Sequence, residues 1–313
     1  MPNTNLSVVI PTYGRTKALK RAINSVLNQT LLPEELIVVD DGNQPPLEEK
    51  IFDAGVTGLE TKILRNKTSR GAANARNAGL RFARSRWVAF LDDDDVFFPE
   101  KIETIARSIQ ENPEVDLIYH PAEICMAKEQ LSYRSGVCDL TNGKDVLRQL
   151  LIRNVVGGTS MTILKRKTLL ELGGFDETMP ALEDWELWIR VAKTGGRFLF
   201  VDKMLTRYHH DNSIRSLTKD YNKTGRAINI LQQKYAGDYA RLSPKNRKQF
   251  NKGKLQSEMF QALLNQDYKG AKKKQFQVAR LSKHPLEFFK FLGLVVWPGG
   301  VFTLRSHLQK FLQ

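Results

Sequence analysis

Residues 87–95, WVAFLDDDD, join a short apolar run to four consecutive aspartates. Residues 87–91 have the length and composition of a buried strand, and the carboxylates from Asp92 to Asp95 begin where that strand ends. Four adjacent carboxylates repel one another and raise their own pKa values unless a cation neutralises them. Carboxylate oxygens suit Mg²⁺ or Mn²⁺, so one prediction is a divalent metal site. The alternative is a solvated acidic loop that caps a helix starting near Pro99.

Strands and helices alternate on the N-terminal side of this segment. Three further short runs rich in apolar residues read as strands, and apolar residues spaced by three and four predict helices packed against one face of a sheet. This order predicts an α/β fold with a doubly wound, mostly parallel sheet. The predicted strands cover 6–10, 36–39 and 61–64, and the predicted helices cover 19–27 and 72–84.

Polar motifs follow three of the predicted strands. They are Pro11 to Arg15, Asp40 to Gly42, and the aspartates after Leu91. Ligands of doubly wound sheets bind beyond the carboxyl ends of the strands, so these motifs are expected to share one edge. Residues 40–43, DDGN, also suit a tight turn, whereas a carboxylate there can accept the ring N–H of a pyrimidine. Both interpretations stay open.

Small residues and two arginines fill residues 69–79, SRGAANARNAG. Small side chains let a helix approach the sheet closely, and arginines that face an acidic edge can bind phosphate. Arg76 is the candidate phosphate ligand, with a surface arginine that balances nearby aspartates as the alternative. For Arg70 the surface interpretation is favoured.

A second acidic motif, Glu183-Asp184, precedes a helical apolar stripe that contains Trp185, Trp188 and Ile189. Helix capping is one explanation, since aspartate is a favoured cap and the helix dipole lowers the pKa of an acid at that end. An ionised carboxylate at the mouth of a site is also what a general base must be. The local sequence does not separate these roles.

His209 belongs to a polar segment, residues 207–212, RYHHDN. A lone histidine is more often a hydrogen-bonded packing residue than a ligand. Because a metal site is predicted nearby, His209 is also a candidate contact of the metal or of a diphosphate.

Charge divides the chain into two unequal parts. Residues 1–214 hold 28 Lys/Arg and 29 Asp/Glu, whereas residues 215–313 hold 20 and 5, so the net charge of +14 comes from the last third. This change of composition predicts one domain over 1–214 and a basic helical region over 215–313. Lysine-rich helices are expected at 221–235, 244–266 and 268–281.

An apolar segment near residues 285–304, interrupted by Pro298-Gly299-Gly300, follows the basic helices. Its strongly apolar stretch, residues 288–302, is shorter than the about 20 residues of a spanning helix, and it is bent. Lysines beside aromatic and aliphatic residues suit the interface of an anionic membrane. The alternative is a segment packed on the N-terminal domain or on a second copy in a homo-oligomer.

The cysteines and the N-terminal residues give information about the cellular compartment of the protein. Cys125 and Cys138 form neither a CxxC pair nor a cluster, so neither a disulfide framework nor a structural zinc site is expected. Residues 1–6 show no signal-peptide pattern. These features favour a cytoplasmic protein, peripheral on the inner face of the membrane. Nucleic acid is not an expected partner, because no zinc-finger or aromatic RNA-binding signature accompanies the basic charge.

Six motifs, in order along the chain, resemble the family-2 glycosyltransferases, whose GT-A fold is a nucleotide-binding α/β module. The resemblance covers about residues 6–214. Gly14 and Asn43 stand where asparagine and serine are usual in the family, and neither change removes a group that the mechanism requires. The motifs are SVVIPTY (7–13), VVDDG (38–42), ARNAG (75–79), FLDDDD (90–95), GGFDE (173–177) and EDW (183–185).

The resemblance implies inverting transfer of a sugar from a nucleotide-diphosphate sugar, with UDP the family's frequent nucleotide. Asp184 matches the family's catalytic base, and Asp95 its Mn²⁺ or Mg²⁺ ligand, with His209 as a second candidate. The nucleotide-sugar site is expected to contain Pro11, Thr12, Tyr13, Asp41, Arg76 and Asp94. The acceptor is expected near Gly157, Gly158, Thr159 and Glu183.

A single candidate base also favours inversion on chemical grounds. One displacement needs one base, whereas retention needs a spaced carboxylate pair that includes a nucleophile. The expected acceptor is a glycan or a lipid-linked hydroxyl in cell-surface polysaccharide synthesis. The alternative function is a catalytically silent protein that binds nucleotide sugars or serves as a scaffold.

Overall fold

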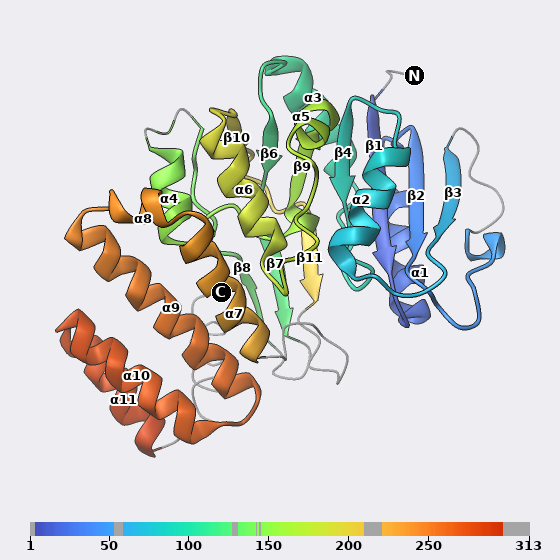
Figure 1. Cartoon of the computed structure of the whole chain (residues 1–313). Coiled ribbons are helices and arrows are strands. Elements are labelled where there is room, and N and C mark those ends of the chain that lie inside the picture. The colour runs from blue at the N-terminus through green and yellow to red at the C-terminus, as the bar shows by residue number, and fades with distance from the viewer. Residues whose placement is uncertain are drawn as a thin grey trace.

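A seven-stranded sheet lies at the centre of the protein in the computed structural model, which describes residues 4–52, 59–126, 131–141, 143, 145–209 and 221–296 (Figure 1). The strand order is β10-β6-β9-β4-β1-β2-β3. Neighbouring strands are parallel except at β9, which is antiparallel to β4 and β6, so the expectation of a mostly parallel sheet is confirmed. The strands are β1 (Leu6–Thr12), β2 (Glu35–Asp40), β3 (Glu60–Arg65), β4 (Trp87–Phe90), β6 (Leu117–Tyr119), β9 (Thr162–Lys165) and β10 (Phe198–Phe200).

Helices cover both faces of this sheet. Alternate residues of β1 point to opposite faces, so Val9 belongs to one apolar core while Val8 and Ile10 belong to the other. The core around Val8 and Ile10 contains α1 (Thr16–Leu27) and α3 (Lys101–Glu111). The core around Val9 contains α2 (Ala72–Phe82), α4 (Val146–Ile152), α5 (Arg166–Glu171) and α6 (Glu183–Lys193).

Helix α2 lies very close to β1, as its small residues predict. A Cβ atom added at Gly79 would lie 2.3 Å from Val9 Cγ1, which no packed side chain tolerates. Glycine at this position therefore sets the spacing between α2 and the sheet, and it places the N-terminus of α2 beside the carboxyl ends of β1 and β2.

A smaller, four-stranded sheet brings His209 to the acidic segment. Its order is β5-β11-β7-β8. Strand β5 begins directly after Asp95, and β11 pairs with it through Arg207 and Val96. The strands are β5 (Val96–Phe97), β11 (Thr206–His209), β7 (Ala122–Met126) and β8 (Leu131–Arg134), and two short 3-10 helices, η1 (Glu49–Ile51) and η2 (Thr159–Met161), complete the domain.

The described C-terminal part of the chain, residues 221–296, contains five helices, and the three predicted lysine-rich helices are confirmed. Ile228 and Leu231 of α7 are buried in the same core as the sheet, whereas α10 and α11 pack on α9 away from it. The expected boundary at residues 214 and 215, and residues 297–304 of the expected apolar segment, lie outside the described residues. The helices are α7 (Tyr221–Lys234), α8 (Ala236–Ala240), α9 (Pro244–Leu264), α10 (Tyr268–Ser282) and α11 (Pro285–Val296).

Candidate active site

A cavity of about 1200 Å³ opens at the carboxyl ends of β1, β2 and β4. The loops after these strands and the start of α2 form its walls, so the three polar motifs do share one edge. All six residues expected at the nucleotide-sugar site line the cavity; they are Pro11, Thr12, Tyr13, Asp41, Arg76 and Asp94. The individual role of each stays a prediction.

Two arginines compensate part of the charge of the acidic run. Arg76 Nη2 lies 2.6 Å from an oxygen of Asp92, and Arg15 Nη2 lies 2.6 Å from an oxygen of Asp93. Arg15 also pairs with Asp94. The two arginines offset at most two of the four carboxylate charges, and Asp95 pairs with neither of them.

Burial raises the pKa values in the acidic run, as the sequence predicts. It raises the pKa of Asp93, it raises that of Asp94 to about 6, and it raises that of Asp95 well above its ordinary value. The neighbouring aspartates add to each shift. Asp93 and Asp95 have no exposed surface, so the alternative of a solvated acidic loop is wrong.

Asp95 and His209 fit a divalent metal. The Asp95 carboxylate accepts a hydrogen bond from the His209 backbone N–H at 3.0 Å. Asp95 Oδ2 and His209 Nδ1 are buried and have no hydrogen bond of normal geometry among the described residues. Burial lowers the pKa of His209, which favours the neutral imidazole that binds metals. Within the described ranges, however, no group of three or more His, Cys, Asp or Glu side chains is placed to hold an ion.

Asp41 anchors the loop between β3 and α2. Its buried carboxylate accepts hydrogen bonds from Asn66 Nδ2 and Ser69 Oγ, both at 2.7 Å, and from the backbone N–H groups of Arg70 and Gly71. Both oxygens are thus already used, and a nucleobase N–H would have to displace one of these donors. The turn interpretation also fits, because Gly42 has a φ of +88°.

Arg76 links the cavity to the second acidic motif. Its Nη1 lies 2.7 Å from Glu183 Oε1, while its Nη2 holds Asp92. Arg76 is 5% exposed, so the alternative of a surface arginine is wrong. Its Nε has no hydrogen-bond partner among the described residues, which leaves a donor for a phosphate oxygen. Glu183, expected near the acceptor, therefore pairs with the candidate phosphate ligand.

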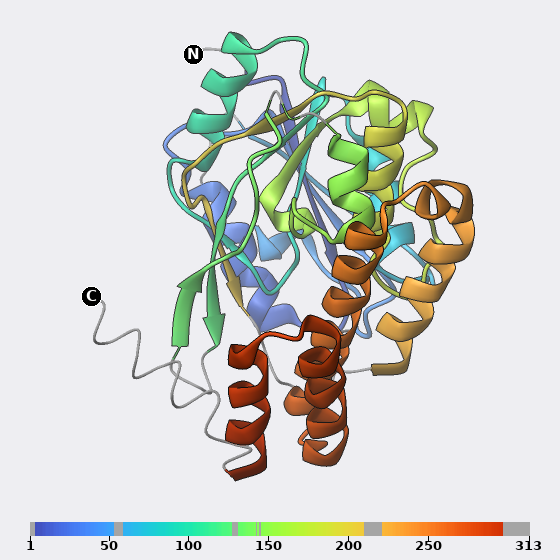
Figure 2. The same ribbon diagram turned by 90° about the vertical axis from the view of Figure 1, so that its left-hand side faces the viewer.

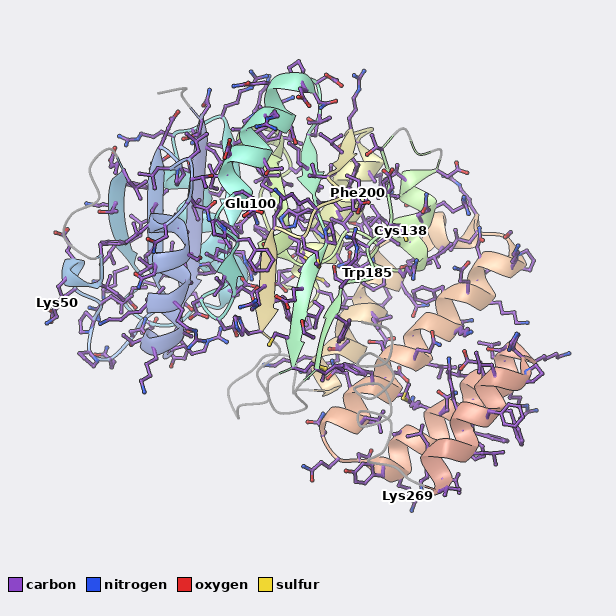
Figure 3. The ribbon with its side chains drawn as sticks, turned by 180° about the vertical axis from the view of Figure 1, so that it is seen from behind. Lys50, Glu100, Cys138, Trp185, Phe200 and Lys269 are labelled. Atoms are coloured by element: carbon purple, nitrogen blue, oxygen red, sulfur yellow. The ribbon has the colours of Figure 1, made fainter. Side chains whose placement is uncertain are left out.

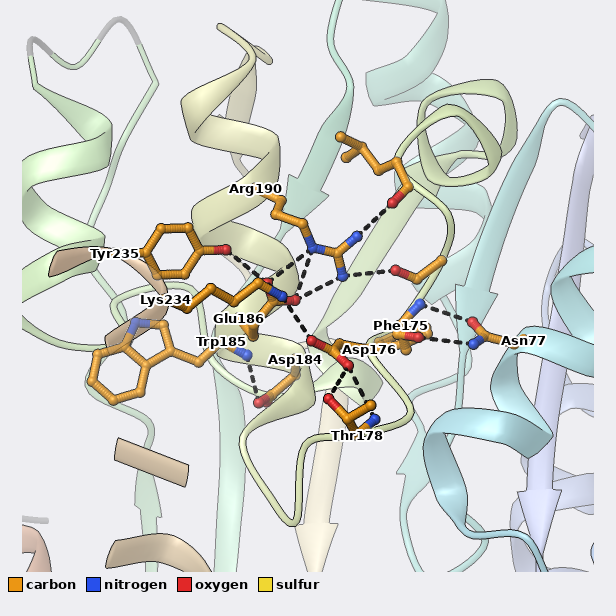
Figure 4. Close-up of polar contacts among 12 residues, drawn as sticks. Asn77, Phe175, Asp176, Thr178, Asp184, Trp185, Glu186, Arg190, Lys234 and Tyr235 are labelled. Atoms are coloured by element: carbon orange, nitrogen blue, oxygen red, sulfur yellow. Dashed lines mark hydrogen bonds and ion pairs between the residues drawn. The ribbon is translucent and has the colours of Figure 1, made fainter. Parts of the chain in front are cut away.

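Asp184 lies at the second position of α6, beside the predicted acceptor stretch. It does not cap the helix: the residue before α6 is Leu182, with a φ of +60°, and the Asp184 carboxylate accepts the Trp185 N–H at 2.6 Å (Figure 4). A Cβ atom added at Gly158 would lie 3.8 Å from Asp184 Oδ2. Trp188 Nε1 donates to the carbonyl of Gly157 at 2.9 Å and ties this stretch to α6.

Thr159, the remaining residue of the predicted acceptor stretch, contacts the acidic run. Its hydroxyl donates to Asp92 at 3.2 Å. The acceptor stretch, Asp184 and the cavity are thus connected through Asp92 and Arg76. This arrangement joins four segments that are far apart in the sequence.

The pKa of Asp184 is raised, so the expectation that the helix dipole lowers it is wrong. Burial is the main cause and the charge of Glu183 the second, and together they raise the pKa to about 7. Arg76 and the Trp185 N–H oppose the shift without cancelling it. A carboxylate with this pKa is a far better proton acceptor at neutral pH than an ordinary aspartate.

The raised pKa predicts how the rate depends on pH. A base works only when it is ionised, so at saturating donor the rate is expected to fall about tenfold per pH unit below pH 7 and to level off above it. Initial rates between pH 5 and pH 9 would measure this profile. A rate that stayed constant from pH 5 to pH 8 would contradict the assignment of Asp184 as the base.

Arg15 and Lys101 are site residues that the sequence did not reveal. Lys101 is fully buried, and its Nζ donates to the carbonyl of Ser160 at 2.8 Å and to Thr206 Oγ1 at 3.1 Å. Burial lowers its pKa, while the charge of Asp95 opposes this. Arg15 could have been found from its place in the first polar motif. Lys101 stands at the start of an amphipathic helix, and nothing in the sequence there indicates a site residue.

A buried glutamate, Glu186, joins α6 to α7 (Figure 4). Arg190 Nη2 and Lys234 Nζ each lie 2.7 Å from its carboxylate, and the Tyr235 hydroxyl donates to it at 2.6 Å. Lys234 also pairs with Asp176 at 2.7 Å. Because Asp184 is two residues before Glu186, this network fixes the helix that carries the candidate base.

The protein is similar to solved structures and to curated relatives. The structure resembles that of the mannosyltransferase PcManGT from Pyrobaculum calidifontis, solved with GDP-Man and Mn²⁺, with a TM-score of 0.57 and 17% identity over 98% of this chain and 87% of that one. An uncharacterized glycosyltransferase of Haemophilus influenzae is 29% identical over 232 residues, which are 74% of this chain and 76% of the relative. The Escherichia coli protein WfgD, a UDP-Glc:alpha-D-GlcNAc-diphosphoundecaprenol beta-1,3-glucosyltransferase, is 29% identical over 189 residues, which are 60% of this chain and 70% of WfgD.

The fold and the cavity at the strand ends are those of a GT-A glycosyltransferase that uses a nucleotide sugar. The sequence model of glycosyl transferase family 2 matches residues 7–171, more than half of the chain. The protein therefore belongs to glycosyl transferase family 2 and is an enzyme of that family.

Proposed function

We propose that the enzyme transfers a sugar from a UDP-sugar to a hydroxyl group of a lipid-linked glycan, with inversion of the anomeric carbon. The observation that carries this proposal is the link from the cavity through Arg76 to Glu183, the residue before the partly buried Asp184. WfgD, which uses UDP-Glc and a diphosphoundecaprenol-linked acceptor, supports the choice of nucleotide and acceptor class. Synthesis of a cell-surface polysaccharide is the setting that such an acceptor implies.

In the proposed reaction, Asp184 removes the proton of the acceptor hydroxyl as that oxygen attacks the anomeric carbon. The bond between this carbon and the diphosphate oxygen breaks, and the nucleoside diphosphate leaves with the electron pair. Arg76, whose Nε lacks a partner among the described residues, is placed to bind a diphosphate oxygen. Attack from the face opposite the leaving group inverts the configuration.

Asp95 and His209 are the proposed ligands of Mn²⁺ or Mg²⁺. When bound, such an ion would offset the charge that develops on the departing diphosphate. Asp95 Oδ2 and His209 Nδ1 are buried and have no hydrogen bond of normal geometry among the described residues, which supports this assignment, as does the Mn²⁺ of the mannosyltransferase from P. calidifontis. Thr12, Tyr13 and Asp41 are the proposed contacts of the base, and Asp94 that of the ribose or diphosphate.

The test is a panel of nucleotide sugars incubated with the purified enzyme and Mn²⁺, read out as slow release of the nucleotide. UDP-sugars are expected to be hydrolysed, and EDTA is expected to stop the release.

Asp95→Asn should weaken Mn²⁺ binding by about tenfold or more, because it removes a charged ligand. Calorimetric titration with Mn²⁺ would measure this, with Asp176→Asn as the control.

Two outcomes would contradict parts of this proposal. Nucleotide release that persists in EDTA would contradict the metal site. Binding of a UDP-sugar without any release or transfer, in the presence of metal and of a lipid-linked acceptor, would favour a silent binding or scaffold protein.

A further inference from the structure

Helix α11 turns one side toward α9 and α10. Glu287 and Leu294, two turns apart, are its buried residues. The carboxylate of Glu287 accepts a hydrogen bond from Gln275 Nε2 of α10 at 3.1 Å, and it lies 3.1 Å from Lys252 Nζ of α9. These contacts fix the rotation of α11 about its axis, and so they decide which side chains point away from the protein.

The outward half of α11 is entirely apolar. Six of its side chains are between 41% and 83% exposed, and because successive helical residues are about 100° apart, all six lie on the half of the helix opposite Glu287 and Leu294. Phe276 of α10 is also exposed and extends this surface, with its ring 5.3 Å from that of Phe291. The six side chains, which we call the α11 face, are Leu286, Phe288, Phe289, Leu292, Val295 and Val296.

Lysines border the α11 face. Lys269, Lys272 and Lys273 lie on the same side of α10 as Phe276, at spacings of seven, four and three residues before it. Lys283 lies in the turn between α10 and α11. None of these four lysines forms an ion pair with a carboxylate in the part of the chain that the structure describes. Their charge is therefore available to an anionic partner.

We propose that the α11 face binds the interface of an anionic phospholipid membrane, with its apolar side chains at the boundary between headgroups and acyl chains. An apolar helix face bordered by lysines is the pattern of an interfacial helix, and the lysines match anionic headgroups. No described helix is long and apolar enough to cross a bilayer. The helix lies in the interface rather than across it.

The hairpin of α10 and α11 projects at the end of the molecule where the parallel strands finish (Figures 1 and 2). Seen from behind, Lys269 lies at the start of α10, at the end of the hairpin opposite the turn between α10 and α11, while Lys50, which lines the cavity, lies at the other side of the molecule (Figure 3). This step rests on the proposed function. Binding through the α11 face turns the carboxyl ends of the strands toward the membrane, and therefore toward an acceptor embedded in it.

The experiment compares the full chain with the double variant Phe289→Ser, Leu292→Ser in sedimentation with vesicles of phosphatidylglycerol and phosphatidylcholine. The wild type is expected to bind the anionic vesicles, to bind pure phosphatidylcholine far less, and to be partly released by 1 M salt. The double variant is expected to bind at least about tenfold more weakly, because two apolar side chains no longer enter the interface. Phe82→Ser, an exposed phenylalanine on α2 in the other part of the molecule, is the matched control and is expected to bind like the wild type.

Hydrolysis of a UDP-sugar, measured in the same samples, needs no membrane. It therefore tests the proposed function independently of membrane binding by the α11 face. Equal vesicle binding by the wild type and the double variant would overturn the proposal, as would wild-type binding that ignores salt and lipid charge. Loss of a dimer in the double variant, measured by light scattering with vesicle binding unchanged, would assign the α11 face to contact between two copies and would also overturn it.

Discussion

Asp184→Asn is expected to lower sugar transfer by about 10²- to 10⁴-fold while the UDP-sugar still binds, because the variant loses the proton acceptor and keeps the shape of the side chain. The affinity for donor should change little, since Asp184 does not line the cavity. The residual rate should also lose the pH dependence near pH 7 that the wild type owes to this carboxylate. Single-turnover transfer at saturating donor, with calorimetry for donor binding, would measure both effects.

Asp176→Asn is a suitable control for this substitution. Asp176 lies before α6, and its carboxylate pairs with Lys234 and Thr178, away from the cavity (Figure 4). Its replacement tests whether any lost carboxylate in this region slows transfer. A normal rate for Asp184→Asn would show that another group removes the proton. A loss of the same size in both variants would indicate a structural effect rather than catalysis.

The sequence predicted four of the seven strands of the central sheet, β1 to β4, because local patterns determine them. β-branched runs ending at polar residues marked β1 and β2, and the aspartates after Leu91 marked the end of β4. The order of these units predicts that their carboxyl ends meet, so the shared edge of the three polar motifs followed from topology, whereas the individual nucleotide-sugar residues came largely from the family resemblance. Nothing in residues 162–165 indicates that β9 runs antiparallel to the strands beside it. Its side chains are buried in nearly the same pattern as those of β4, which is parallel to β1.

Charge pairing within the site could not be predicted in the same way. Arg15 and Asp93 are 78 residues apart, and only the closure of the sheet brings them together. The acidic run alone suggested a metal as the neutralising cation, whereas two arginines supply part of that charge. The pKa of Asp184 depends in the same way on burial, which tertiary packing creates, and burial outweighs the helix dipole that the local sequence suggested.

Glu186→Ala is expected to destabilise the fold by about 3–5 kcal/mol, the typical result of removing one partner from a buried ion pair. The glutamate side chain has no exposed surface, and its loss leaves Arg190 and Lys234 without their shared carboxylate. The Tyr235 hydroxyl loses its acceptor as well. Urea denaturation, followed by far-UV circular dichroism, would measure the change in the free energy of unfolding.

Glu171→Ala provides the comparison for this prediction, because Glu171 forms an exposed ion pair with Lys167 at 3.7 Å on α5. Its loss is expected to cost less than about 1 kcal/mol, since water solvates both charges once they are separated. A similar small loss for Glu186→Ala would mean that water reaches Arg190 and Lys234 and replaces the carboxylate. In that case α7 could not hold α6 through this network, and the position of Asp184 would depend on the other contacts of α6, which include the buried Trp185 and Trp188 and the ion pair of Glu183 with Arg76.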